Sequence, residues 1–487
     1  MCGIAAIHGS VDPMPGRRML DRIGHRGPDG RGELVTSDAW LGHVRLSIVD
    51  LEGGDQPLST PDGRLHLVGN GEIYNHKRLR EKLGSDRFAT DSDNEGALQL
   101  VAQKGPAGLR ELWGMYAVAV AGRDGTFVAA RDPVGIKPLY WARRGEEVRF
   151  ASELVAFDDD WREAVELFPP GHYWTPKEGF VRFARAVPAH VEPRFEPPSR
   201  PDEPPPAPLV EELRDMLIRA VERRMMADVH IGVFLSGGLD SSIIAAVAAR
   251  TARRCGYVLP TFAVGTHNSP DIAAARLVAD FLGTDHHERV YTSEEARAVL
   301  PAVVRSIESF DPSLVRSAVP NYLLSELTAR TVKVVLTGEG ADELFAGYEY
   351  VRDVGSEEDL HDELVRTVGS LHGLNLQRCD RVTMAHGLEA RVPFLDLDMI
   401  ALCLAIPAAW KTCDGGRQEK RILREAFAGW VPDEILWRDK AQFGDGSGAA
   451  DVLALDDDSQ EEAYRKIFLE HLGGIDPART LTRSATA

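Results

Sequence analysis

The cysteine at position 2, in the stretch "MCGIAAIHG", is the first residue whose type and place suggest chemistry. After removal of Met1, Cys2 carries a free α-amine, whose pKa is ordinarily about 7.7–8.0. That amine is a base within the nucleophile's own residue, so a reactive thiolate needs no separate histidine. The alternative is an inert thiol buried at the start of a strand. Cys2 alone does not decide between the two.

The stretch "VFLSGGLDSS", residues 233–242, has the pattern of a phosphate-binding loop. An apolar strand ends at Leu235, a Ser-Gly-Gly turn follows, and a helix begins near Asp240. Glycines let the backbone approach phosphate oxygens, and a helix N-terminus adds free N–H groups and the positive end of its dipole. The spacing and the lysine of a Walker A loop are missing. Two serines and an aspartate exceed what an ordinary strand–turn–helix junction requires, so we expect a pyrophosphate site.

A second loop, "TGEGADE" at residues 337–343, places Glu339 and Asp342 between glycines after the apolar strand "VKVVL". Alone, this pattern fits a solvated loop equally well. It gains meaning as a neighbour of residues 236–242 on the same sheet. Asp240 and Asp342 could then hold Mg²⁺ on ATP oxygens, which leaves Glu339 for acid–base work.

Two different scaffolds are expected to position these residues. Residues 1–190 are rich in strands and turns, with Asp124-Gly125 as the turn of one hairpin, and predict layered antiparallel sheets. After Pro208, short apolar runs alternate with helical patterns. This alternation predicts a doubly wound parallel α/β sheet, whose ligands bind beyond the carboxyl ends of the strands. The chain from about Leu360 to Val452 is expected to be helical.

A proline-rich segment divides the chain between these scaffolds, since it can form neither a continuous helix nor an internal strand. The predicted organisation is a first domain, a linker, a second domain and an unstructured tail: residues 1–190, 191–208, 209–470 and 471–487.

Composition limits the classes of partner. The formal net charge of −19 argues against nucleic acid, because phosphate backbones are held by clustered lysine and arginine. No apolar stretch approaches the roughly 20 residues that span a bilayer, and no signal peptide is recognisable, so we expect a cytoplasmic protein without a membrane partner. The five cysteines include no C-x-x-C pair, which disfavours zinc and disulfides.

The second half resembles a known family when its motifs are taken together. "LSGGLDSS" looks like the PP-loop of the N-type ATP pyrophosphatases, which split ATP between the α and β phosphates. "FAVGTHNSPD", "TGEGADELFAGY", "GLEARVPFLD" and "EKRILREAF" with "WRDKAQFGDG" together resemble the synthetase domain of the glutamine-dependent asparagine synthetase family. The resemblance implies that Leu235 and Val264 contact adenosine through backbone groups. It also implies a set of residues that cradle pyrophosphate or line the nucleotide site: Ser236, Gly237, Gly238, Ser241, Ser242, Thr337 and Gly338.

The resemblance assigns the charged residues as well. Asp240 and Asp342 would bind Mg²⁺, and Glu339 would control an acyl-adenylate, as the base for incoming ammonia. Arg316 and Lys440 would offset phosphate charge. For each of these two basic residues, an ordinary surface ion pair is the alternative.

The first half resembles the class II glutamine amidotransferase domain, an N-terminal-nucleophile (Ntn) fold of αββα layers. The motifs that carry this resemblance are "MCGIAAIHG", "HRGPDG", "GHVRLSIVD", "GNGEIYN" and "TDSDNE". It implies that the Cys2 thiolate attacks the side-chain amide of glutamine. The Asn70 side chain and the Gly71 N–H would stabilise the oxyanion. His25 is expected to support the site rather than to react.

The same resemblance implies how glutamine is held. Arg45 would bind the α-carboxylate in a bidentate grip, and Glu72 and Asp93 would bind the α-ammonium. Backbone groups of one segment would line the pocket: Arg45, Leu46, Ser47, Ile48 and Val49. Considered one at a time, Arg45 and Asp93 would be interpreted as ordinary charged residues on the surface. As a set in the family's order, they favour the nucleophile over the inert thiol at Cys2.

Together the two halves predict glutamine-dependent amidation of L-aspartate with ATP and Mg²⁺. A relative that amidates another carboxylic acid remains an alternative, as does, less favourably, a ring-closing enzyme of the β-lactam synthetase type. Cys2 and Glu339 oppose the ring-closing alternative, because that branch tends to lose the cysteine and to carry tyrosine in place of the glutamate. The resemblance also suggests a homodimer and an enclosed passage for ammonia.

Overall fold

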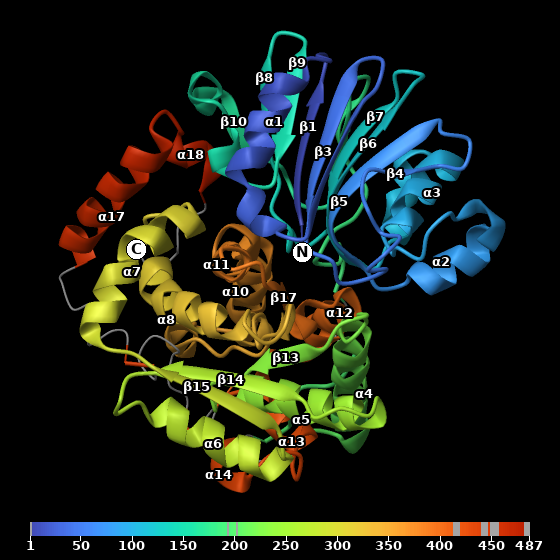
Figure 1. The fold of residues 1–487 in the computed structure, drawn as a ribbon. Helices are drawn as coiled ribbons and strands as arrows, with labels where there is room; N and C mark the ends of the chain where they lie inside the picture. The colour runs from blue at the N-terminus through green and yellow to red at the C-terminus, as the bar shows by residue number, and fades with distance from the viewer. Residues whose placement is uncertain are drawn as a thin grey trace.

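The computed structural model describes residues 2–191, 194–200, 203–412, 419–439, 447–448 and 457–481. Its first part, residues 2–182, contains two antiparallel sheets, and its second part, residues 207–481, is built around a parallel sheet (Figure 1). The coarse expectation of a strand-rich first half and an α/β second half is therefore confirmed. Among the described residues, no helix is both long enough and apolar enough to cross a lipid bilayer.

The first part has two six-stranded sheets, ordered β10-β8-β9-β1-β3-β2 and β12-β11-β7-β6-β5-β4. The strands of the first sheet are β1 (Gly3–His8), β2 (Gly30–Val35), β3 (Ala39–Arg45), β8 (Tyr140–Arg144), β9 (Glu147–Ala151) and β10 (Val165–Leu167). Those of the second sheet are β4 (Leu58–Ser59), β5 (Leu65–Ile73), β6 (Gly114–Gly122), β7 (Phe127–Arg131), β11 (His172–Thr175) and β12 (Gly179–Arg182). The predicted hairpin is confirmed as β6 and β7, with Gly125 at φ +81° in the turn.

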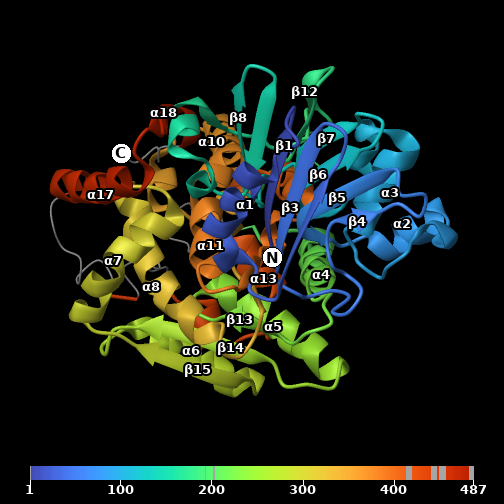
Figure 2. The same cartoon turned by 45° about the horizontal axis from the view of Figure 1, so that its top comes forward.

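The two sheets pack face to face because alternate residues of each strand point to opposite sides. In β1, Ile4 and Ala6 belong to the apolar cluster between the sheets, whereas Ala5 and Ile7 face the other way. The outer faces are covered by α1 (Pro13–Arg22) on one side and by α2 (His76–Leu83) and α3 (Glu95–Lys104) on the other, as Figure 2 shows.

The parallel sheet of the second part has the order β15-β14-β13-β16-β17. Its strands are β13 (Ile231–Phe234), β14 (Pro260–Gly265), β15 (Asp285–Val290), β16 (Val334–Leu336) and β17 (Glu389–Arg391). The chain leaves β13 toward β14 on one side and returns as β16 on the other. A crevice forms beyond the carboxyl ends of strands where the order reverses in this way, and such crevices bind ligands in open α/β sheets.

The described helices of the second part are α4 (Ala207–Arg224), α5 (Leu239–Arg254), α6 (Pro270–Leu282), α7 (Ser293–Ile307), α8 (Pro312–Thr328), α9 (Ala341–Leu344), α10 (Glu357–Ser370), α11 (Asn375–Met384), α12 (Leu397–Ala405), α13 (Arg421–Ala426), α14 (Asp433–Leu436), α17 (Asp457–Leu472) and α18 (Pro477–Thr480). The prediction of an unstructured tail from residue 471 is wrong for α18. Asp476 caps this helix, and Arg479 donates to the backbone oxygen of Glu163, which ties it to the first part. Residues 482–487 lie outside the described residues.

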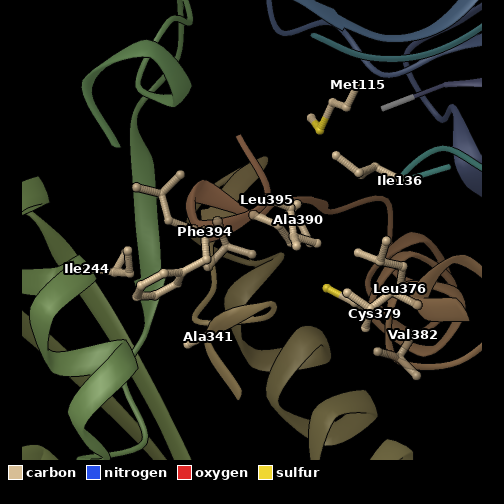
Figure 3. Packing of buried hydrophobic residues seen from close by; sticks show 14 of the residues in the cluster. Met115, Ile136, Ile244, Ala341, Leu376, Cys379, Val382, Ala390, Phe394 and Leu395 are labelled. Atoms are coloured by element: carbon tan, nitrogen blue, oxygen red, sulfur yellow. The ribbon is translucent and has the colours of Figure 1, made fainter. Parts of the chain in front are cut away.

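The two parts meet through apolar side chains. Met115 and Ile136 of the first part lie opposite Leu376 and Val382 of α11 (Figure 3). All four belong to one buried cluster that continues into the parallel sheet. Burial of apolar surface is therefore shared between the parts, and α11 is the helix at their boundary.

Charged side chains are also buried at this boundary. Arg26 lies 2.6 Å from a carboxylate oxygen of Glu153 and 2.9 Å from one of Asp380. Arg381 lies 3.0 Å from Glu153 and 3.0 Å from Glu308. None of the five is more than 4% exposed. Each arginine thus holds two carboxylates out of water.

Arg381→Met is expected to lower the free energy of unfolding by ~3–5 kcal/mol, because it leaves the buried Glu308 without its counter-charge and removes one of those of Glu153. Urea unfolding followed by tryptophan fluorescence measures the change. The matched control is Arg330→Met, since Arg330 is exposed and pairs with Glu326 on the surface of the same part. That change is expected to cost ~0–1 kcal/mol. Equal losses in the two variants would contradict a stabilising role for the buried network.

Candidate active sites

Cys2 stands directly before β1, at an end where β1, β3 and β5 converge. Its backbone nitrogen donates to Oδ1 of Asn70 at 3.1 Å. Its sulfur lies 3.9 Å from the backbone oxygen of Leu46, in the segment after β3. The residue is half-buried, and burial raises the pKa of the Cys2 thiol. Residues far apart in the sequence are thus brought around one thiol.

Asn70 and Gly71 lie on β5 beside this thiol. Nδ2 of Asn70 is buried and has no hydrogen-bond partner among the described residues. A buried amide donor without a partner is costly, so a ligand oxygen would be favourable there. Gly71 has φ +139°, and a Cβ on it would lie 1.9 Å from the backbone oxygen of Met115. Only glycine allows β5 to approach β6 so closely at this point.

The predicted glutamine-binding charges belong to the strands beside Cys2 or contact them: Arg45 ends β3, Glu72 lies on β5, and Asp93 bonds the end of β5. Arg45 is buried and donates to the backbone oxygens of Asp50 at 2.6 Å and Leu51 at 3.2 Å, and to the Asp55 carboxylate at 2.7 Å. In the rest of the predicted segment, the nitrogen of Ser47 donates to Asp29 and the oxygen of Ile48 accepts from Asp228.

Asp93 is also buried. One of its carboxylate oxygens accepts from the nitrogen of Ile73 at 2.5 Å and the other from the Asn94 side chain at 3.2 Å. Burial raises the pKa of Asp93 to about 6, against the opposing effect of these hydrogen bonds. The Glu72 carboxylate lies 3.3 Å from Arg391 of β17 in the second part.

A cavity of about 410 Å³ lies at the carboxyl ends of β13, β14 and β16. Most of the residues predicted to bind nucleotide or metal line it, together with the predicted catalytic Glu339: Leu235, Ser236, Gly238, Asp240, Ser241, Val264, Thr337, Gly338 and Asp342. Gly237 and Ser242 lie just behind them, Gly237 against α6 and Ser242 inside α5 with no exposed surface. The two loops predicted from sequence therefore share one cavity.

Lys420 joins these two loops. Its Nζ lies 2.5 Å from Oδ2 of Asp240 and 2.6 Å from Oδ1 of Asp342. Burial opposes its charge, but the two carboxylates outweigh burial and raise the pKa of Lys420. It therefore stays protonated between them.

The structure fits a Mg²⁺ ion at these two carboxylates. The described residues hold no group of three or more His, Cys, Asp or Glu side chains that could bind a metal ion. Asp240 and Asp342 nevertheless both face one cation, the Lys420 ammonium. Mg²⁺ is commonly bound by one or two carboxylates together with substrate phosphates and water. Two carboxylates in the two loops expected at the nucleotide would meet that requirement.

Glu339 is paired with Arg378 of α11, whose guanidinium also donates to the Ser317 hydroxyl at 2.7 Å. Next to it, the buried Glu343 accepts from the Tyr348 hydroxyl at 2.5 Å. Burial raises the pKa of Glu343 to about 7, with a contribution from the neighbouring Asp342. The cavity thus holds carboxyl groups in different electrostatic surroundings.

Of the two basic residues predicted to offset phosphate charge, the structure describes Arg316. Arg316 does not line the cavity, because Ser313, Ser317 and Asn321 form the i, i+4, i+8 row of α8 that faces it. The Arg316 guanidinium lies 3.3 Å from Gln460 of α17 instead. Lys440 lies outside the described residues.

The sequence did not predict several of the charged residues that line this cavity, among them Glu343, Arg378 and Lys420. Lys420 lies in "EKRILREAF" and Glu343 in "TGEGADELFAGY", two stretches that carried the family resemblance. Both could have been found as charged residues within those motifs. Arg378 precedes "GLEARVPFLD" and carries no local signal.

Comparisons with known proteins agree with this geometry. A family model described as Asparagine synthase matches residues 212–356 and 351–479, and one described as Glutamine amidotransferase domain matches residues 1–178. "Asparagine synthetase [glutamine-hydrolyzing] 2" of Arabidopsis thaliana is 41% identical over 94% of this chain and 81% of its own length. "Asparagine synthetase [glutamine-hydrolyzing]" of Triphysaria versicolor is 40% identical over 99% of this chain and 84% of its own. "Probable asparagine synthetase [glutamine-hydrolyzing]" of Schizosaccharomyces pombe is 40% identical over 94% and 87%.

Gly237→Ala is expected to lower the free energy of unfolding by ~2 kcal/mol or more, through strain and a clash in the loop. Gly237 has φ +73°, and a Cβ would lie 2.5 Å from the Cβ of Ala274 and 2.6 Å from the nitrogen of Ala275. Gly238→Ala is the matched control, because a Cβ there meets only the Ser236 hydroxyl, at 3.3 Å. It is expected to stay within ~0.5 kcal/mol of the wild type. Urea unfolding compares them, and similar stabilities would refute the steric argument.

Proposed function

The chain belongs to the family of glutamine-hydrolysing asparagine synthetases, and from this premise we propose that it makes asparagine from L-aspartate, glutamine and ATP. Residues 1–190 would form a glutaminase domain of the Ntn type, and residues 209–470 a PP-loop synthetase domain. The observation that supports the proposal is that one chain contains two preformed sites. One is a thiol beside a buried unpartnered amide donor, and the other is a carboxylate-rich cavity at a phosphate-binding loop.

In the first site Cys2 is the nucleophile once it is the N-terminal residue. Its α-amine accepts the thiol proton, and the thiolate attacks the side-chain amide of glutamine. The amide oxygen then gains negative charge. Nδ2 of Asn70 and the backbone N–H of Gly71 stabilise that oxyanion. Water releases glutamate from the acyl-enzyme, after ammonia has left.

Glutamine is held by its amino-acid end. Arg45 binds the α-carboxylate, and since its guanidinium is buried the charge-assisted bond forms away from bulk water. Asp93 binds the α-ammonium. The contact of Glu72 with Arg391 leaves Asp93 as the better ammonium ligand of the two predicted carboxylates. Backbone groups from Leu46 to Val49 line the pocket.

In the second site the loop after β13 binds the phosphates of ATP. Leu235 and Val264 contact the adenosine through backbone groups. The phosphate-binding residues are Ser236, Gly237, Gly238, Ser241 and Ser242, with Thr337 and Gly338 at the edge of the site. The aspartate β-carboxylate attacks the α-phosphate, which gives β-aspartyl-AMP and pyrophosphate.

Asp240 and Asp342 would hold Mg²⁺, which supplies positive charge to the phosphate oxygens when bound. Glu339 would take the proton that incoming ammonia loses as it attacks the acyl carbon. Its pairing with Arg378 fixes the carboxylate at the cavity wall. Lys440 would offset phosphate charge. Arg316 is a weaker candidate for that role, because its guanidinium contacts Gln460.

Ammonia would pass between the sites through the protein. The supporting observation is the apolar boundary described above, where Met115 and Ile136 lie opposite Leu376 and Val382. Cys379 and Val382 of α11 also line the synthetase cavity. Such surroundings favour neutral ammonia over ammonium, because burial of an unpaired charge is costly.

Cys2→Ala is expected to abolish glutamine-dependent asparagine formation and to leave ammonium-dependent formation within about twofold of the wild type. The reason is that the variant loses only the nucleophile of the first site. Pyrophosphate release and asparagine are measured with ATP, Mg²⁺ and a panel of carboxylic acids, each with glutamine or with ammonium chloride. Aspartate should be the acid that supports turnover.

Two results would contradict the proposal. Loss of both activities in Cys2→Ala would refute the division of labour between the sites. Turnover by the wild type with another acid but not with aspartate would point to an amidotransferase for a different substrate. Protein that retains Met1 serves as a second control. It should lose glutamine-dependent asparagine formation and keep ammonium-dependent formation.

The KM for glutamine is expected to rise as pH falls through about 6. Above that pH the Asp93 carboxylate is charged and can bind the α-ammonium, whereas below it the carboxyl is protonated and the ion pair is lost. In glutaminase assays, the KM for glutamine should be about tenfold higher at pH 5 than at pH 7, with most of that rise below pH 6. Asp93→Asn is the control and should have a high KM that does not change over this range. A wild-type KM independent of pH would remove Asp93 from ammonium binding.

A further inference from the structure

Lys420 occupies the position between the two proposed metal ligands. Its ammonium lies 2.5 Å from Asp240 and 2.6 Å from Asp342, so both carboxylates already bind one positive charge that belongs to the chain. A divalent cation bound by the same oxygens would have to displace this ammonium or share the carboxylates with it. The question is whether the lysine only stabilises the fold or also affects metal binding.

The surrounding backbone fixes Lys420 at this place. The residue is 2% exposed, and its φ of +59° lies in the left-handed region that non-glycine residues rarely adopt. Its nitrogen donates to the oxygen of Lys411 at 3.0 Å, and α13 begins directly after it. Strained backbone of this kind persists where surrounding structure enforces it, and it is concentrated at functional sites.

Gly347 makes room for the same ion pair. A Cβ on Gly347 would lie 2.0 Å from Oδ1 of Asp342 and 2.5 Å from Cε of Lys420. Its nitrogen donates to the backbone oxygen of Asp342 at 2.9 Å. Three separate segments therefore close around one ammonium: the loop after β13, the loop around α9 and the start of α13.

We propose that Lys420 competes with the divalent cation for Asp240 and Asp342, so that metal binds well only together with nucleotide phosphates. This inference rests on the proposed function, which assigns those carboxylates to Mg²⁺. An ammonium between two carboxylates removes one of their two negative charges and repels an arriving dication. Phosphates bring both oxygen ligands and additional negative charge, which also attracts Lys420 itself. Lys420 is then a positioning residue that makes metal and nucleotide binding mutually dependent.

A purely structural ion pair predicts something different. In that case removal of Lys420 exposes unpaired buried carboxylates and lowers stability, but the dependence of metal binding on nucleotide stays as it was. Stability alone therefore does not separate the two roles. The affinity for metal in the absence of nucleotide does separate them, because only the competing role predicts that this affinity rises when Lys420 is replaced.

The test measures Mn²⁺ binding to the full-length protein by electron paramagnetic resonance, with and without α,β-methylene-ATP. Lys420→Gln is expected to bind Mn²⁺ without nucleotide about tenfold more tightly than the wild type, because the competing charge is gone. Lys420→Met, a second uncharged variant, should show the same gain. Lys420→Arg keeps the charge and should behave like the wild type. Circular dichroism checks that each variant folds.

Arg421→Gln is the matched control, since it removes a neighbouring positive charge that pairs with Glu425 instead. It should leave Mn²⁺ affinity unchanged. One result would overturn this inference but not the proposed function. In that result the wild type binds Mn²⁺ with nucleotide, but the folded, uncharged Lys420 variants bind Mn²⁺ without nucleotide no more tightly than the wild type does. If wild type and Lys420→Gln bind no Mn²⁺ even with nucleotide, the proposed metal site fails and the inference fails with it.

Discussion

Both sites depend on the charged pairs of α11. On one side of this helix Arg378 holds Glu339 at the wall of the nucleotide cavity. On the other side Asp380 binds Arg26, and the Nε of Arg26 donates to the backbone oxygen of Cys2 at 3.0 Å. The residue expected to generate ammonia and the residue expected to use it are therefore positioned from the same helix. Such buried pairs add little net stability over apolar packing, but each fixes a geometry, because any other arrangement leaves a charge without a partner.

The sequence predicted the parts of this arrangement that depend on local pattern. The loops 236–242 and 337–343 each follow a short apolar run, and parallel strands end at the same edge of a sheet. Their carboxylates were therefore expected to lie together, and Lys420 joins Asp240 and Asp342 in the structure. The hairpin at Asp124-Gly125 was predicted for a similar reason, since its turn residues and strand alternation lie within twenty residues or so of each other.

What the sequence did not predict depends on contacts between distant segments. Asp240 and Lys420 are 180 positions apart, and no periodicity connects them. The neighbours of Glu72 in "GNGEIYN" carry no signal for the contact of its carboxylate with Arg391 across the boundary between the two parts. Arg316 has a suitable charge but lies beside the α8 row that faces the cavity. The polar composition of the last residues favoured disorder, and α18 is ordered by its cap and by contacts with the first part.

The charge balance of the cavity explains why net charge was a poor guide to its ligand. The chain carries a formal charge of −19, yet the expected substrate is itself a polyanion. Cations do line the cavity, but in pairs: Lys420 with Asp240 and Asp342, Arg378 with Glu339, Arg424 with Glu419, and Arg438 with Asp271. Paired charges present little net field to an approaching phosphate. An anionic ligand must therefore exchange partners with these pairs or bring its own cation. A nucleotide that arrives with a divalent metal would do both, because the metal would compete for the carboxylates and the phosphates would pair with the released ammonium and guanidinium groups.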